Sequence, residues 1–70
     1  MFNSMSEELY TFIIWKKLKN IIGEGNVWMT SGCIRIYNQF GYTDYNLEAY
    51  YQNEIVPIIV VKAICKDYIK

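Results

Sequence analysis

The sequence predicts a small two-layer α+β domain with the element order α-β-β-β-α. Three patterns predict this class: an amphipathic N-terminal run with capping signals, two β-rich runs on either side of Ser31-Gly32, and regularly spaced lysines near the C-terminus. The simplest packing of this order is an antiparallel three-stranded sheet with both helices on one face. We expect one domain over residues 1–70, with residues 1–4 as a loose N-terminus.

The first element is a helix that we predict from about Ser6 to Ile22. Ser4-Met5-Ser6-Glu7 is typical of a capping box, and Gly23 suits the position just after a helix. At the helical period, one apolar face is expected to cover the core; it comprises Tyr10, Ile14, Leu18, Ile21 and Ile22.

A second apolar stripe lies roughly opposite on the same helix and consists of Met5, Leu9, Phe12 and Ile13. A helix that rests on one sheet needs only one apolar stripe. The second stripe therefore indicates contact either with another helix of the domain or with a partner chain, such as a second copy. The core of a 70-residue chain also leaves little net stability, which favours a homodimer.

The next two elements are strands over Asn26–Thr30 and Cys33–Gln39, which form a hairpin around a two-residue loop at Ser31-Gly32. This loop gives a register that pairs Thr30 with Cys33, Met29 with Ile34, Trp28 with Arg35 and Val27 with Ile36.

Strand alternation then divides the hairpin side chains between two faces. The core face receives Val27, Met29, Ile34 and Ile36. The opposite face receives Trp28, Arg35 and Tyr37. There we expect Arg35 to stack on the Trp28 ring, a cation–π contact of about 0.5–1 kcal/mol at an exposed site.

A second turn is predicted at Gly41–Asp44, followed by a third strand at Tyr45–Gln52. That strand points Tyr50 outward with Asn46 and Glu48, and sends inward Tyr45, Leu47, Ala49 and Tyr51. A short helix through the same residues, capped by Thr43 or Asp44, is the alternative, because Leu-Glu-Ala favours helix.

The last element is predicted to be a helix over Pro57–Ile69. The β-branched run at residues 58–61 favours a strand, whereas Pro57 fits the first turn of a helix and would interrupt a central strand. The lysines decide between the two, because Lys62, Lys66 and Lys70 recur on one arc opposite an apolar arc.

Residue types that carry out catalysis are scarce in this chain. It has no histidine, and Cys33 and Cys65 are too far apart to form a paired zinc-ligand motif. The glycines form no phosphate-cradle spacing. We therefore expect no enzyme, no metal and no cofactor. The two thiols are expected to be reduced, with one disulfide between them as the alternative.

Targeting and charge point to a cytoplasmic protein. Residues 1–8 lack the basic character of a secretory signal, and the longest apolar run, Ile55–Val61, is too short for a membrane span. Seven basic and seven acidic residues give a formal net charge of zero, which disfavours nonspecific nucleic-acid binding and favours self-association.

Two groups of side chains are candidates for binding. The first is aromatic, is expected on the open sheet face and its loop, and comprises Trp28, Arg35, Tyr37, Phe40, Tyr42 and Tyr50. The second is basic, lies on the two helices as a candidate phosphate-binding set, and comprises Lys16, Lys17, Lys19, Lys62 and Lys66. For the basic set, a solvated helix face is the favoured interpretation.

The predicted order resembles that of the double-stranded-RNA-binding domain, a family with a Gly-Pro-x-His loop and a Lys-Lys-x-x-x-Lys start to its second helix. This chain has neither motif, because it has no histidine and its second helix begins with the apolar run Pro57-Ile58-Ile59-Val60-Val61. The resemblance is one of topology alone, and topology does not carry function.

We therefore expect a non-catalytic protein-binding module that acts as a regulator, inhibitor or adaptor, and forms a homodimer. Isoleucine, asparagine, lysine and tyrosine make up 30 of the 70 residues, and their AT-rich codons indicate a bacterial, phage or plasmid source. The alternative function is a small nucleic-acid-binding domain that stacks bases on the aromatic sheet face and contacts phosphates through the helix lysines.

Overall fold

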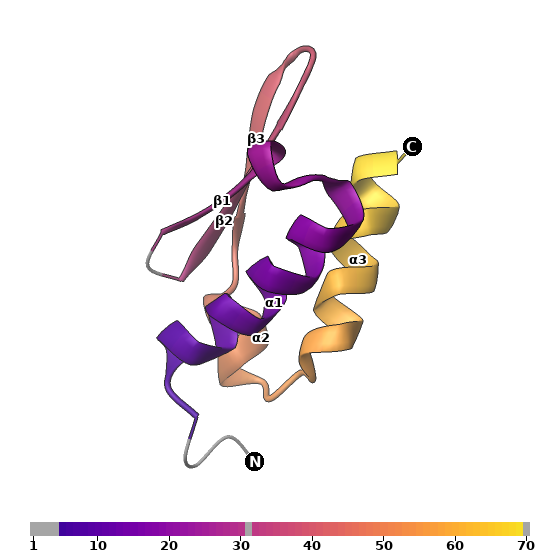
Figure 1. Cartoon of the computed structure of the whole chain (residues 1–70). Helices are drawn as coiled ribbons and strands as arrows, with labels where there is room; N and C mark the ends of the chain where they lie inside the picture. The colour runs from indigo at the N-terminus through magenta and orange to yellow at the C-terminus, as the bar shows by residue number, and fades with distance from the viewer. Residues whose placement is uncertain (1–4, 31, 70) are drawn as a thin grey trace.

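Figure 1 shows the computed structural model of the chain, which describes residues 5–30 and 32–69. The helices are α1 (Glu7–Ile22), the short α2 (Glu48–Gln52) and α3 (Pro57–Ile69), and the strands are β1 (Val27–Thr30), β2 (Cys33–Asn38) and β3 (Gly41–Asn46). The 3-10 turn η1 (Glu24–Asn26) links α1 to β1. The strands form an antiparallel sheet in the order β1-β2-β3. The predicted α+β class is confirmed, whereas the predicted loose N-terminus at residues 1–4 lies outside the described residues.

The first helix has the predicted extent but a different cap. The Ser6 hydroxyl accepts a hydrogen bond from the Leu9 N–H at 3.1 Å, so Ser6 is the N-cap. Ser4, the capping residue of the predicted box, lies outside the described residues. At the other end, Gly23 takes a φ of 124° and donates its N–H to the Lys19 carbonyl at 3.1 Å. Glycine suits this conformation, which other residues rarely adopt.

The β1–β2 hairpin has the predicted register, with Val27 opposite Ile36 and Thr30 opposite Cys33. The loop residue Ser31 itself lies outside the described residues. Alternation buries Val27, Ile34 and Ile36 against the helices, as expected.

Met29 is an exception to the predicted core, because its side chain is 40% exposed. It lies on the edge strand β1, and it borders Glu8 and Thr11 on the helix side. At this edge no further strand of the described sheet covers Met29, so its expected core position is wrong.

The second turn lies at Gln39-Phe40, earlier in the chain than the predicted turn at Gly41–Asp44. The Asn38 side-chain carbonyl accepts the Phe40 N–H at 2.7 Å, and Gly41 takes a φ of 130°. Both features favour a tight connection between strands. The third strand is therefore β3, and the predicted strand at Tyr45–Gln52 is wrong beyond Asn46.

Residues 48–52 form α2, the helix that the sequence offers as the alternative to a strand. The Asn46 side-chain carbonyl, rather than Thr43 or Asp44, accepts the Glu48 N–H at 2.9 Å. The predicted outward position of Tyr50 on the sheet is wrong, because Tyr50 lies in α2 and packs half-buried against the core. Ala49, expected inward, is exposed.

The core forms where α1 and α3 lie on one side of the sheet (Figure 1). The helix predicted at Pro57–Ile69 is confirmed as α3. Ile21, predicted on the core face of α1, is exposed at the end of that helix, beyond its buried part. The buried apolar residues are Tyr10, Ile14, Leu18, Val27, Ile34, Ile36, Leu47, Val60, Val61 and Ile64.

Tyrosine hydroxyls join the layers at the edge of this core. The Tyr10 hydroxyl donates to the Ile55 carbonyl before α3, and the Tyr45 hydroxyl on β3 donates to the Asp67 carboxylate on α3. Tyr51 of α2 donates to the Met5 carbonyl at 2.6 Å, and its ring meets the edge of Tyr10 at 5.3 Å. These contacts place the segment between β3 and α3 beside the start of α1.

We predict that Tyr10→Phe lowers the free energy of unfolding by about 1–2 kcal/mol, because the part-buried Ile55 carbonyl loses its donor. Urea denaturation followed by circular dichroism measures the change. Tyr68→Phe is the matched control, since its hydroxyl makes no hydrogen bond in the described part of the chain, and we expect a change below about 0.5 kcal/mol. Equal losses in the two variants would contradict the role of the Tyr10 hydroxyl.

A second prediction concerns alkaline pH. Burial, and then the hydrogen bond to Asp67, raise the pKa of Tyr45 to about 12. The unfolded chain ionises near pH 10, so the folded state retains a proton that the unfolded state loses. The stabilisation that the raised pKa of Tyr45 contributes is present below pH 10, and it disappears as the pH rises toward about 12.

Wild type should therefore lose stability more steeply than Tyr45→Phe between pH 10 and 12, as measured by urea denaturation at each pH. Lysine deprotonation affects both proteins alike and cancels in the comparison. Parallel curves for the two proteins would show that Tyr45 does not contribute.

Candidate interaction surface

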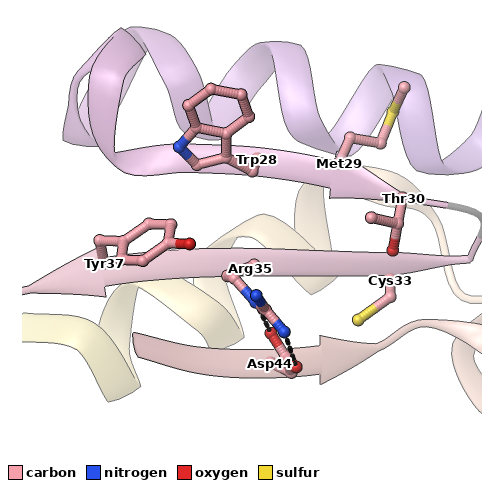
Figure 2. A pocket seen from close by; sticks show the side chains of 7 residues that line it. All are labelled: Trp28, Met29, Thr30, Cys33, Arg35, Tyr37 and Asp44. Carbon is pink, nitrogen blue, oxygen red and sulfur yellow. Dashed lines mark hydrogen bonds and ion pairs between the residues drawn. The ribbon is translucent and has the colours of Figure 1, made fainter. Parts of the chain in front are cut away.

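The sheet face that points away from α1 and α3 is the candidate surface, and we call it the open face. The register places on it Trp28 and Thr30 from β1, Cys33, Arg35 and Tyr37 from β2, and Tyr42, Asp44 and Asn46 from β3. Figure 2 shows a hollow in this face, lined by Trp28, Met29, Thr30, Cys33, Arg35, Tyr37 and Asp44. The prediction that Trp28, Arg35 and Tyr37 share one face is therefore confirmed by the strand register.

Arg35 is the centre of the open face, and it is held by β3. Its guanidinium donates a bidentate pair of hydrogen bonds to the Asp44 carboxylate, with Nε–Oδ1 at 2.8 Å and Nη2–Oδ2 at 3.0 Å (Figure 2). The same guanidinium carbon lies 3.9 Å from the centre of the Tyr42 ring. The predicted stacking of Arg35 on Trp28 is wrong, because Asp44 is directly opposite Arg35 in the register and offers a charged partner.

This pair shifts the ionisation of both groups in the expected directions. The hydrogen bond from Arg35 lowers the pKa of the Asp44 carboxyl, and the hydrogen bond to Asp44 raises the pKa of Arg35. Both side chains remain well exposed, so solvent screens their attraction and the pair contributes little to stability. Its main effect is to hold the guanidinium group over the Tyr42 ring.

Two tyrosines extend this cluster toward the hairpin end. Tyr37 and Tyr42 are opposite one another on β2 and β3, and their rings meet edge to face at 5.7 Å. Tyr42 stays 56% exposed although it contacts both Tyr37 and Arg35. A ring held from two sides but open to solvent loses little conformational entropy when it binds.

Phe40 lies at the tip of the β2–β3 hairpin and is 88% exposed. Figure 1 shows that this hairpin extends beyond the helical layer. The Asn38 side chain and Gly41 build the turn that presents the ring. Phe40 is therefore a large apolar side chain that the described part of the fold leaves in solvent.

Trp28 lies at the other side of the open face, on the edge strand β1. Its indole N–H donates to the Gly25 carbonyl at 3.3 Å, and its side chain is 58% exposed. Figure 2 shows the Trp28 ring above β1 and Arg35 turned toward Asp44, so the two side chains point apart. Trp28 therefore forms a separate aromatic contact point beside the Arg35–Tyr42 cluster.

The second apolar stripe of α1 (Met5, Leu9, Phe12 and Ile13) is only partly exposed to solvent. Met5 packs against the core, and Ile13 is half-buried. Leu9 and Phe12 are 46% and 40% exposed. The Phe12 ring lies 5.6 Å from the Trp15 ring, and Trp15 in turn packs on the core. The stripe therefore reduces to an exposed pair, Leu9 and Phe12, with Ile13 at its margin.

The candidate lysines lie away from the open face. Lys16 and Lys17 border a hollow on the outside of α1, together with Phe12, Ile13 and Asn20. Lys19 stacks on the Trp15 ring at 4.1 Å, and Lys62 and Lys66 are exposed on α3. The helices cover the opposite face of the sheet, so the aromatic and basic parts of the nucleic-acid hypothesis lie in different layers.

Reactive chemistry is sparse in the described ranges. Both cysteines are free; Cys33 lies on the open face, and burial raises the pKa of the Cys65 thiol on α3. Within residues 5–30 and 32–69, no group of three or more cysteines, aspartates and glutamates is arranged to hold a metal ion. In the same residues, no helix is long and apolar enough to cross a membrane.

Comparison of the chain with protein families, with curated proteins and with solved structures gives no match.

We predict that Arg35→Gln raises the pKa of the Asp44 carboxyl toward its ordinary value of about 3.9, because the charged donor is lost. Carbon-detected NMR titration of the carboxyl measures the midpoint. The Arg35–Asp44 pair stabilises the fold at pH values above the ordinary pKa of a carboxyl group. This contribution disappears as the pH falls through the lowered pKa of Asp44. Lys62→Gln, remote on α3, should leave the midpoint unchanged; the same midpoint in wild type and Arg35→Gln would contradict the assigned cause.

Proposed function

We propose that this chain is a non-catalytic protein-binding module whose open face binds a partner protein. The observation that carries the proposal is the exposed pair Trp28 and Tyr42 on the open face, with Phe40 exposed at the adjoining hairpin tip. No helix of the described residues covers this face. Tyrosine, tryptophan and arginine are the residue types that dominate binding energy at protein interfaces.

The geometry of this set suits a binding surface that is rigid before contact. Arg35 is fixed by Asp44 and Tyr42, and Tyr42 is fixed by Tyr37. Binding therefore immobilises few rotatable side chains, which lowers its entropic cost. The Arg35–Asp44 pair leaves no net charge at the centre, so aromatic contact rather than charge supplies the affinity.

The proposed role is that of a cytoplasmic regulator, inhibitor or adaptor, of phage or other mobile-element origin. Such a role needs a surface that occupies another protein and needs no reactive group. The scarcity of reactive groups in the described residues is compatible with it.

Capture from lysate of the source organism, with variants as baits, tests the proposal. Phe40→Ala combined with Tyr42→Ala should lose a protein that wild type retains, with affinity for the purified partner reduced at least about tenfold. Ile59→Ala on α3 is the matched control, because it removes an exposed apolar side chain from the other layer and should retain the partner. Equal capture by wild type and the double variant would refute binding through the open face.

The module also forms a homodimer in this proposal, through Leu9 and Phe12 on α1. Both side chains are apolar and exposed, and α1 has already covered the sheet with its other face. Phe12→Glu should therefore shift the protein from dimer to monomer in sedimentation equilibrium at micromolar concentrations. Lys62→Glu controls for added negative charge and should remain dimeric. A monomeric wild type would contradict this part of the proposal.

A further inference from the structure

The outer side of β1 carries backbone groups that no strand of the described sheet pairs. β1 lies at the sheet edge and pairs with β2 alone. The Trp15 indole N–H donates to the Val27 carbonyl at 3.1 Å, so that carbonyl points away from β2. Since backbone groups alternate along a strand, the N–H and C=O of Met29 point to the same outer side. β1 also has no charged residue and no proline, which commonly protect sheet edges from strand addition.

Hollows border this edge on both faces of the sheet. On the open face, Trp28 and Thr30 line the hollow shown in Figure 2. On the helix side, one hollow lies by Trp15 and Val27 and extends around the edge to Trp28. Another lies by Thr11 and extends around the edge to Thr30. Met29 lines all three hollows. A strand added to β1 sends alternate side chains to the two faces, so its side chains meet these hollows.

The helix-side hollows are acidic at both ends of the edge. Glu24 lines the hollow near Val27, and Glu8 lines the hollow near Thr30. Neither carboxylate makes an ion pair within the described part of the chain. No lysine or arginine is among the described residues that line these two hollows.

We propose that the free edge of β1 binds an extended peptide of a partner protein, with basic side chains toward the helices and apolar side chains over the open face. The Met29 N–H and C=O supply the backbone hydrogen bonds, and Glu8 and Glu24 select the basic side chains. The inference rests on the proposed function as a protein-binding module, and it names the chemistry of one bound segment.

A second copy of this chain is the other strand that the edge could accept, and its charges oppose that pairing. In an antiparallel pair with a two-fold axis at Met29, the Val27 end of one copy lies beside the Thr30 end of the other. Glu24 of one copy then lies near Glu8 of the other. Like charges across an interface oppose association, whereas a basic peptide neutralises both groups.

The blocked peptide Val-Lys-Val-Lys-Val-Lys-Val is a suitable probe, with Glu in place of Lys as its matched control. Titration into the full chain, followed by tryptophan fluorescence and amide NMR, measures binding. We expect saturable binding of the lysine peptide and at least about tenfold weaker binding of the glutamate peptide. The Met29 amide should exchange rapidly in the free protein and slowly in the complex, because its N–H gains a partner.

Met29→Pro removes the outward N–H and is compatible with an edge strand, so it should weaken the lysine peptide at least about tenfold. Met29→Ala keeps the N–H and controls for the lost side chain. Glu8→Gln with Glu24→Gln should weaken binding and reduce its salt dependence. Should Met29→Pro fail to fold, the exchange rate of the Met29 amide in wild type decides the question.

The inference is overturned by equal affinity for the two peptides, by an unchanged Met29 amide in the complex, or by a β1-mediated dimer that Met29→Pro dissociates. The variant Phe40→Ala with Tyr42→Ala separates this inference from the proposed function. It should lose the open-face partner but still bind the lysine peptide. Loss of partner capture in that variant, together with no peptide binding in wild type, would refute the edge site alone.

Discussion

The alternation of side chains along β2 is the constraint on which the rest of the structure depends. Ile34 and Ile36 enter the core beneath α1 and α3, and this fixes Arg35 and Tyr37 on the opposite face. A slip of one residue would bury a guanidinium and expose two isoleucines, so the register is strongly determined. Because both long helices lie on the same side, no other described element covers the opposite face. The candidate surface is thus a consequence of how the core is built.

Tyrosine serves two different purposes in this fold. Tyr10, Tyr45 and Tyr51 pack their rings against the core and donate their hydroxyls to neighbouring elements. Tyr37 and Tyr42 instead contact one another and Arg35 on the open face. The dense tyrosine stretch in the second half of the chain therefore divides into structural rings and surface rings. The strand or helix that carries each ring decides which purpose it serves.

The sequence predicts those parts of the fold that depend on local signals. The extent of α1, the break at Gly23, the hairpin register and the lysine arc of α3 each rest on a few neighbouring residues. Local signals do not decide residues 47–52, because Leu47-Glu48-Ala49 fits both a strand and a helix. In the structure, Tyr50 packs from α2 against the core. The signal for the second turn was present as Asn38 with Gly41 around Gln39-Phe40. Arg35 illustrates the same limit within the candidate site, since its true partner Asp44 becomes its neighbour only when β3 takes its place beside β2.

Hydrogen exchange of the complex with a captured partner tests the central claim most directly. In the proposed function, the partner contacts the sheet through the open face, the hairpin tip and the β1 edge. Exchange should therefore slow at residues 27–46 on binding, above all at amides that point to solvent in the free protein. Slowing confined to α1 and α3, with residues 27–46 unchanged, would show that the partner binds the helical layer and would contradict the account.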